Sequence, residues 1–184
     1  MIKLIGIVNF NNDKLPEDLI KVFAELSDNV IVISHKENYL KIIKESCITN
    51  WVFSSSDLTP NTKKIEIDFD KMFKITNKNF LLLGFTMKKL LKHLGYKMYK
   101  RSRAMKMKLE SPPYDLFNNI QPQMHLVKKE KHYFDIYEDP MKKIEIFLTY
   151  KNILTIAQYK KILLLDFNPE YSEDGMQILE NWII

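Results

Sequence analysis

Short apolar runs rich in isoleucine and valine alternate with amphipathic segments in the first half of the chain. The runs at 2–8 and 29–34 are typical of buried parallel strands. Between them, apolar residues recur at helical spacing after Pro16, and proline is favoured in the first turn of a helix. Residues 38–45 repeat the helical spacing, and the run at 51–53 predicts a third strand. This alternation predicts a βαβ unit and a parallel sheet.

The most hydrophobic strand candidate covers residues 80–83 and turns at Gly84 into a predicted helix. Apolar residues recur on one face of that helix between Met87 and Leu94. Gly95 follows at the position where a left-handed residue commonly ends a helix. The sequence therefore predicts a strand, a corner and a helix around Gly84.

From Tyr96 onward the pattern changes to alternation of apolar and polar residues, which is typical of strands with one exposed face. A last helix is predicted from near Ser172, with Glu173 and Asp174 in its first turn. We therefore predict an α/β fold: a doubly wound, mainly parallel sheet with flanking helices and a smaller antiparallel sheet in the second half, in one domain over 1–184. The alternating segments are 105–109, 124–127, 133–137, 144–150, 153–159 and 162–167.

Composition excludes several classes of site. The chain has 184 residues, of which 46% are apolar, enough for one core. The single cysteine, Cys47, excludes a disulfide framework and a zinc site with two or more thiolates, and it favours a reducing compartment. We expect Cys47 to be a small apolar filler. The four glycines are too far apart for a glycine-rich phosphate loop, and we expect no cofactor and no metal.

The start of the chain has no signal-peptide pattern, and no apolar stretch approaches about 18 residues. We therefore expect neither secretion nor a membrane partner, and a cytoplasmic location. Frequent Ile, Lys and Asn indicate an AT-rich genome, such as that of a low-GC bacterium, a parasite or a large DNA virus. For a viral source, the virion is a second location.

Positive charge is concentrated in one window. Residues 88–108 hold nine of the 28 basic residues and no acidic residue, whereas the rest of the chain has 19 basic and 23 acidic residues. Such a stretch could bind nucleic-acid phosphates or an acidic protein surface, and it is equally typical of the solvated face of a helix and a hairpin. The residues are Lys88, Lys89, Lys92, Lys97, Lys100, Arg101, Arg103, Lys106 and Lys108.

Three segments carry motifs in a fixed order: LLGFTMKKLLKHLG at 82–95, FNPE at 167–170 and GMQILENW at 175–182. They resemble the nucleophile elbow, the F-H-P-E motif and the final helix of the class I glutamine amidotransferase domain, most of all its GMP-synthetase type. The segment 113–117 is similar to the short helix that lies between the first two motifs in that family. The resemblance implies a flavodoxin-like sheet with a glutamine site at its carboxyl edge.

The chemistry of that family needs a thiolate nucleophile, a histidine that carries the proton, a glutamate that orients the histidine, and backbone N–H groups for the oxyanion. The position that matches the nucleophile is Gly84, which has no side chain. The position that matches the histidine is Asn168, which does not titrate near neutrality. Glu170 alone matches, and the resemblance therefore predicts a pseudoenzyme.

The surroundings of the elbow also depart from the family. Leu82 and Thr86 stand where the elbow favours very small residues, and Lys88 replaces a glutamine. Ser55 and Ser56 lie in the loop that matches the oxyanion-hole segment S-G-G-P, so we expect the glutamine pocket to be refilled. Cys47 cannot substitute for the nucleophile, because we expect it at the opposite edge of the sheet.

Other polar residues are candidate sites with simpler interpretations. Glu66, Asp68 and Asp70 would share one face of a strand and could hold a hard cation, although a solvated edge is the simpler interpretation. The histidines show no metal-binding spacing, and His93 is expected at the surface. Tyrosines near the basic window could stack on bases, but amphipathic strands use the same composition.

These patterns support three functional hypotheses. The first is an inactive amidotransferase-like protein that acts as a structural or regulatory module by binding a protein partner. The second is a nucleic-acid-associated accessory protein that uses the 88–108 window. The third is a noncatalytic subunit that docks on an ATP-dependent synthetase of the GMP-synthetase type. The sequence leaves the partner and the oligomeric state open.

Overall fold

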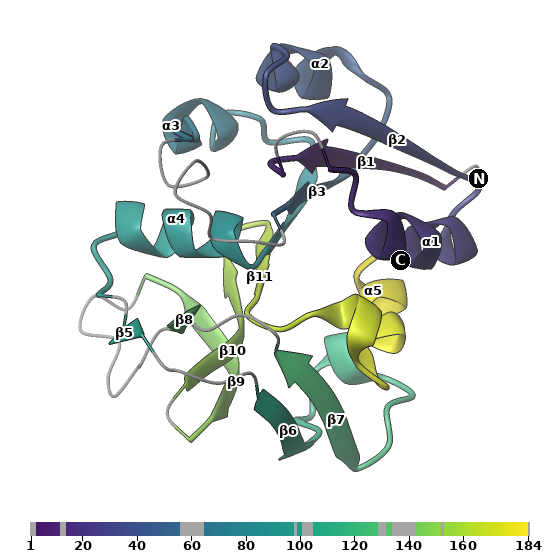
Figure 1. Ribbon diagram of the computed structural model, residues 1–184, viewed down its shortest axis with the longest axis vertical. Coiled ribbons are helices and arrows are strands. Elements are labelled where there is room, and N and C mark those ends of the chain that lie inside the picture. The colour runs from purple at the N-terminus through teal and green to yellow at the C-terminus, as the bar shows by residue number, and fades with distance from the viewer. Residues whose placement is uncertain are drawn as a thin grey trace.

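The protein is built around a seven-stranded mixed sheet (Figure 1). The computed structural model describes residues 3–11, 14–55, 65–97, 99–100, 105–128, 132–133, 143–151 and 153–183. Across the sheet the strands are β2 (Asn29–Ser34), β1 (Leu4–Asn9), β3 (Asn50–Ser54), β4 (Asn79–Leu83), β11 (Ile162–Leu165), β10 (Ile153–Tyr159) and β9 (Glu145–Tyr150). The strands from β2 to β11 pair in parallel, and β10 and β9 extend the sheet in antiparallel pairs.

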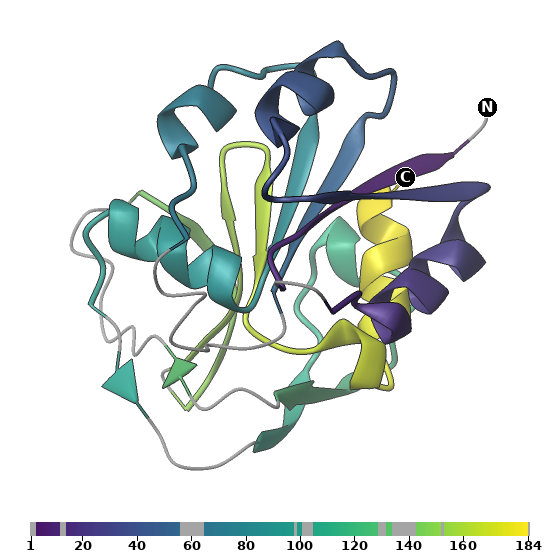
Figure 2. The same cartoon turned by 45° about the horizontal axis from the view of Figure 1, so that its top comes forward.

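Helices cover both faces of the sheet, which confirms the predicted doubly wound arrangement (Figures 1 and 2). One face packs against α2 (Tyr39–Glu45), α3 (Phe69–Met72) and α4 (Phe85–His93). The other face packs against α1 (Glu17–Leu26) and α5 (Gly175–Ile183). Each face forms its own apolar cluster, because alternate residues of a strand point to opposite sides.

The second half of the chain has two small antiparallel sheets where the sequence predicts one, and the alternating segments 144–150, 153–159 and 162–167 belong instead to the large sheet. Strand β6 (Met105–Glu110) pairs with β7 (Gln123–Lys128), and β5 (Tyr99–Lys100) pairs with β8 (His132–Tyr133). Residues 134–137, which belong to one predicted strand, lie outside the described residues. The short 3₁₀ helix η2 (Asp115–Phe117) lies between β6 and β7 and agrees with the short helix that the resemblance implies near 113–117. A second one, η3 (Pro169–Tyr171), lies between β11 and α5.

Two sequence-based expectations are wrong in the acidic segment and at the last helix. Residues 69–72 form α3, so Glu66, Asp68 and Asp70 do not share a strand face. Asp68 instead caps this helix, because its carboxylate accepts the Lys71 backbone N–H at 3.0 Å. Helix α5 begins at Gly175 rather than near Ser172.

Candidate functional site

The corner between β4 and α4 is made by Gly84. Its backbone has φ 53° and ψ −115°, a conformation that L side chains rarely adopt and that glycine adopts without a Cβ clash. The Gly84 N–H donates to the carbonyl of Leu165 at 3.3 Å, which ties the corner to the neighbouring strand β11. The predicted strand-to-helix corner at residue 84 is therefore confirmed, and its geometry is that of a sharp elbow.

A cavity of about 360 Å³ opens beside this corner at the carboxyl edge of the parallel strands. Gly84, Ser54 and Ser55 form its floor at the ends of β3 and β4, and Asn168 and Glu170 line it from the segment after β11. The start of α1 and the residues before it form the remaining wall. Positions that are far apart in the sequence thus meet where ligands commonly bind in open α/β sheets.

Asn168 and Glu170, which match the histidine and glutamate of the motif, contact each other. The amide Nδ2 of Asn168 donates to Oε1 of Glu170 at 3.2 Å. The Asn168 N–H also donates to the carbonyl of Val127 on β7 at 2.8 Å, which fixes the backbone at this position. The pair therefore keeps a donor beside the carboxylate, but an amide takes up no proton near neutrality.

Small hydroxyl side chains are buried in and beside the cavity lining. Ser54 and Ser55 are buried, and the hydroxyl oxygen of Ser55 has no hydrogen-bond partner among the described residues. Thr86 is also buried, and its hydroxyl lies 2.7 Å from the carbonyl of Phe53 and 2.9 Å from that of Leu83. This contact ties the first turn of α4 to the ends of β3 and β4. Ser56, the second serine of the predicted oxyanion loop, lies outside the described residues.

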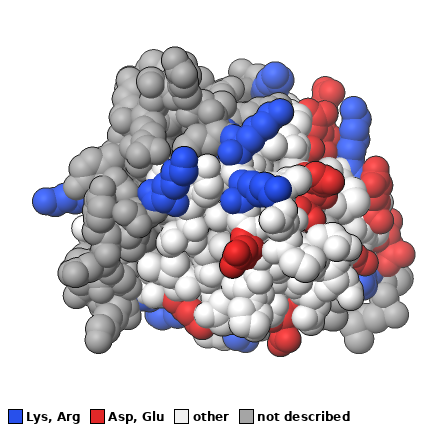
Figure 3. All heavy atoms as spheres, turned by 90° about the horizontal axis from the view of Figure 1, so that it is seen from below, with Lys and Arg blue, Asp and Glu red and all other residues white. Residues whose placement is uncertain are grey.

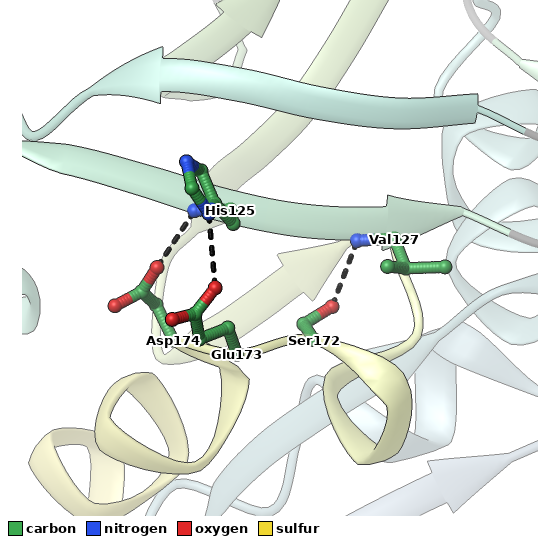
Figure 4. Close-up of polar contacts among 5 residues, drawn as sticks. All are labelled: His125, Val127, Ser172, Glu173 and Asp174. Carbon is green, nitrogen blue, oxygen red and sulfur yellow. Dashed lines mark hydrogen bonds and ion pairs between the residues drawn. The ribbon is translucent and has the colours of Figure 1, made fainter.

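The segment that carries Asn168 and Glu170 is attached to the edge of β7 by side chains (Figure 4). Ser172 Oγ accepts the Val127 N–H at 2.9 Å, and the Asp174 carboxylate accepts the His125 N–H at 2.6 Å. Glu173 Oε2 lies 2.9 Å from Nδ1 of His125. These side chains accept the N–H groups at the edge of β7 that a neighbouring strand would otherwise accept. The small β6–β7 sheet therefore holds the segment that lines the cavity with Asn168 and Glu170.

Lys88 does not belong to a basic surface, which corrects the prediction from the 88–108 window. Its side chain is 2% exposed, and its Nζ lies 3.6 Å from the carboxylate of Asp166, which follows β11. Lys128 of β7 is also buried and contacts the same carboxylate. Burial lowers the pKa of Lys88 from its ordinary value of 10.5 to about 8, against the attraction of Asp166, and burial likewise lowers the pKa of Lys128.

This buried cluster of Lys88, Asp166 and Lys128 joins α4, β7 and the end of β11. The sequence pattern alone does not predict this cluster. A signal was present, because Asp166 stands between the apolar residues Leu165 and Phe167 at the end of a strand, where a carboxylate needs a buried partner.

The other basic residues of the window are distributed over several elements. Lys89 is half-buried, and its Nζ lies 5.1 Å from the centre of the Phe85 ring. Figure 3, a view from below, shows both signs of charge on that face of the molecule. The side chains of Lys92, Lys97, Lys106 and Lys108 are exposed, Lys100 is described by its backbone in β5, and Arg101 and Arg103 lie outside the described residues.

Cys47 lies in the turn between α2 and β3, at the amino edge of the sheet, whereas Gly84 lies at the carboxyl edge. The expected separation of Cys47 from the site is therefore confirmed. The expectation that Cys47 fills the core is wrong, because its side chain is exposed. It lies in a polar segment between a helix end and a strand, and it belongs to neither apolar cluster of the described residues.

The histidines and acidic residues do not gather into a metal centre in the described part of the chain. Among the residues that the structure places, no group of three or more His, Cys, Asp or Glu side chains could hold a metal ion. His93 is partly exposed, as expected, and lies 3.6 Å from the carboxylate of Asp70. Over the same residues, no helix has the length and apolar character needed to cross a bilayer.

Known proteins resemble this chain in structure. No family model and no curated protein matches its sequence. A GMP synthase subunit protein from Thermoplasma acidophilum matches with a TM-score of 0.76 and 14% identity, over 100% of this chain and 93% of that chain. A chain of PurLQS from Thermotoga maritima matches with a TM-score of 0.72 and 12% identity, over 99% and 98% of the two chains.

A third match is a glutamine amidotransferase from Thermotoga maritima, with a TM-score of 0.62 and 12% identity over 97% of this chain and 81% of that chain. The three matches extend over 97% or more of this chain, and their TM-scores are all above 0.6. The chain therefore has the class I glutamine amidotransferase fold.

Proposed function

We propose that this protein is an inactive relative of glutamine amidotransferases that acts by binding a protein partner. The observation that carries the proposal is the elbow itself: residue 84 has the sharp backbone conformation of a nucleophile position, and it is a glycine. An acyl-enzyme cannot form at a residue without a side chain.

The remaining groups of the cavity support the same conclusion. Asn168 takes up no proton near neutrality, so it cannot act as the base that activates a nucleophile or carry a proton to leaving ammonia. Glu170 accepts a hydrogen bond from this amide, where the family motif would place an imidazole. The single cysteine is at the other edge of the sheet. Loss of a nucleophile lowers the rate by a factor on the order of 10⁶ in a well-studied hydrolase.

The rim of the cavity supports a binding role. Leu15 and Tyr171 line the cavity, and they are 54% and 41% exposed, although both are large and apolar. The Tyr171 hydroxyl donates to the carboxylate of Asp18 at 2.6 Å, and this bond raises the pKa of Tyr171 to about 12. The ring is therefore held in place at the rim. Fixed, exposed apolar side chains beside a cavity are typical of surfaces that bind proteins.

The likeness to a GMP synthase subunit indicates which partner to look for first. We propose an ATP-dependent synthetase, on which the chain would dock as a noncatalytic subunit. This partner is tested by co-purification of a synthetase with the tagged protein from its native source. Tyr171→Ala should weaken the association, and Tyr114→Ala is a matched control, because Tyr114 is 42% exposed at a different site.

A glutaminase assay tests the absence of catalysis. Ammonia release from glutamine by the purified chain should equal that of a heat-inactivated sample. The double variant Gly84→Cys with Asn168→His restores the two missing groups and shows whether the cavity still admits glutamine. Hydrolysis by the unaltered chain above the heat-inactivated control would contradict the proposal.

A further inference from the structure

Strand β2 forms one edge of the large sheet, and no described strand pairs with its outer side (Figure 1). Its sequence, Asn-Val-Ile-Val-Ile-Ser, contains no charged residue and no proline. The Ile31 side chain at its centre is 42% exposed and belongs to neither apolar cluster of the described residues. An uncharged, β-branched edge strand of this kind is a ready template for pairing with another strand.

The opposite edge of the same sheet is built differently. Strand β9 carries Glu145, and its pairing with β10 shifts register between Leu154 and Ile156 and again between Ile156 and Ala157. Charges and bulges are devices that protect an edge from pairing. Strand β2 pairs with β1 in unbroken register over its whole length and has none of these devices. The contrast within one sheet indicates that the β2 edge is kept open for a contact.

We propose that β2 pairs with β2 of a second copy of this chain, antiparallel and about a two-fold axis, so that two sheets become one. A second copy fits because the strand is self-complementary: no like charges face each other across an uncharged strand. In the register that places Val32 opposite its own copy, Ile31 lies opposite Ile33. An antiparallel pair about a two-fold axis also brings the Asp28 end of one strand to the Lys36 end of the other, so the charges that flank the strand are opposite in sign.

The mass of the full chain in solution tests this dimer. Light scattering during gel filtration, over a range of loading concentrations, should give about twice the monomer mass of 22.0 kDa. Ile31→Lys should reduce the mass to that of a monomer, because a lysine on an edge strand opposes pairing. Leu15→Lys is the matched control and should remain dimeric, since Leu15 is exposed outside the sheet.

Hydrogen exchange keeps the test independent of any variant. Amides of residues 29–34 should exchange more slowly as the protein concentration rises, and amides of β9 should not respond. A monomer at every concentration overturns the proposal and would leave the β2 edge to a different protein chain. A dimer whose mass Ile31→Lys does not change, or whose β2 amides exchange at a constant rate, overturns it as well.

Discussion

Replacing Lys88 by methionine should stabilise the protein. Lys88 is 2% exposed and shares the Asp166 carboxylate with Lys128, so the described cluster holds two ammonium groups and one carboxylate. Methionine has a similar length and no charge. The variant leaves the pair of Lys128 and Asp166 in place, and replacement of a buried ionic group by an apolar residue of similar volume is often neutral or stabilising.

The pKa of Lys88 gives the size of the effect. Its value falls from 10.5 to about 8 on folding, mainly because burial disfavours the charged form. At about 1.36 kcal/mol for each pKa unit, the charged lysine costs about 3 kcal/mol of folding free energy at pH 7, where it is protonated in both states. We therefore expect Lys88→Met to raise the free energy of unfolding by up to about 3 kcal/mol at pH 7.

The pKa shift of Lys88 also determines how the stability difference between Lys88→Met and the unaltered chain changes with pH. Between pH 8 and 10.5 the unfolded chain binds more protons at Lys88 than the folded chain, so the unaltered protein gains stability as the pH rises. The advantage of Lys88→Met should therefore be full below pH 8 and shrink toward pH 10.5. Urea unfolding at about pH 7 and about pH 9.5 measures this difference. The exposed Lys92 provides the control, because Lys92→Met should change little at either pH.

Two results would refute this reasoning. The first is a Lys88→Met variant that is less stable than the unaltered chain near neutral pH. The second is an advantage that stays constant between the two pH values. Asp166→Asn provides the opposite perturbation, because it leaves two buried ammonium groups without their shared carboxylate. It should lower the free energy of unfolding by about 3–5 kcal/mol.

Three further predictions concern the elbow, the cavity wall and the basic window. Gly84→Ala should lower the free energy of unfolding by about 1–3 kcal/mol in urea titrations, because φ 53° strains any residue with a Cβ. Ser172→Ala should cost about 1–3 kcal/mol, since it removes the acceptor of a strand N–H, and an unchanged unfolding midpoint would count against this anchor. If the exposed lysines bind nucleic acid, the retention of DNA on filters by the protein should fall steeply as the salt concentration rises. The double variant Lys106→Glu with Lys108→Glu should retain less DNA at each salt concentration. A protein that retains no DNA at low salt would remove this hypothesis.

The strands, helices and elbow could be predicted because local patterns determine them. Apolar runs bounded by turn residues predict the parallel strands, and the glycine between residues 80–83 and a helical stripe predicts the corner. The resemblance of the F-N-P-E segment predicts that Asn168 and Glu170 lie beside the elbow, and both line the cavity there. Each of these inferences needed only short stretches of sequence.

The buried cluster could not be predicted in the same way, because its members come from α4, β7 and the end of β11. A run of lysines indicates a charged surface, and only the tertiary arrangement reveals that Lys88 points into the core. Helical spacing gave a partial signal, since Lys88 lies three residues before the buried Leu91. The exposure of Cys47 is a similar case, because cysteine is usually buried. That general preference predicts a buried side chain, whereas the polar neighbours of Cys47 favour an exposed one.

The geometry of the elbow rests on hydrogen bonds that do not need a side chain at residue 84. The Gly84 N–H donates to the Leu165 carbonyl, and the Thr86 hydroxyl contacts the carbonyls of Phe53 and Leu83. A side chain at this position would add strain to the fold, whereas glycine adopts φ 53° without that cost, so the corner is compatible with the absence of a side chain. The corner and the cavity beside it can therefore be maintained without a reactive side chain at residue 84, which is what the proposed binding role requires.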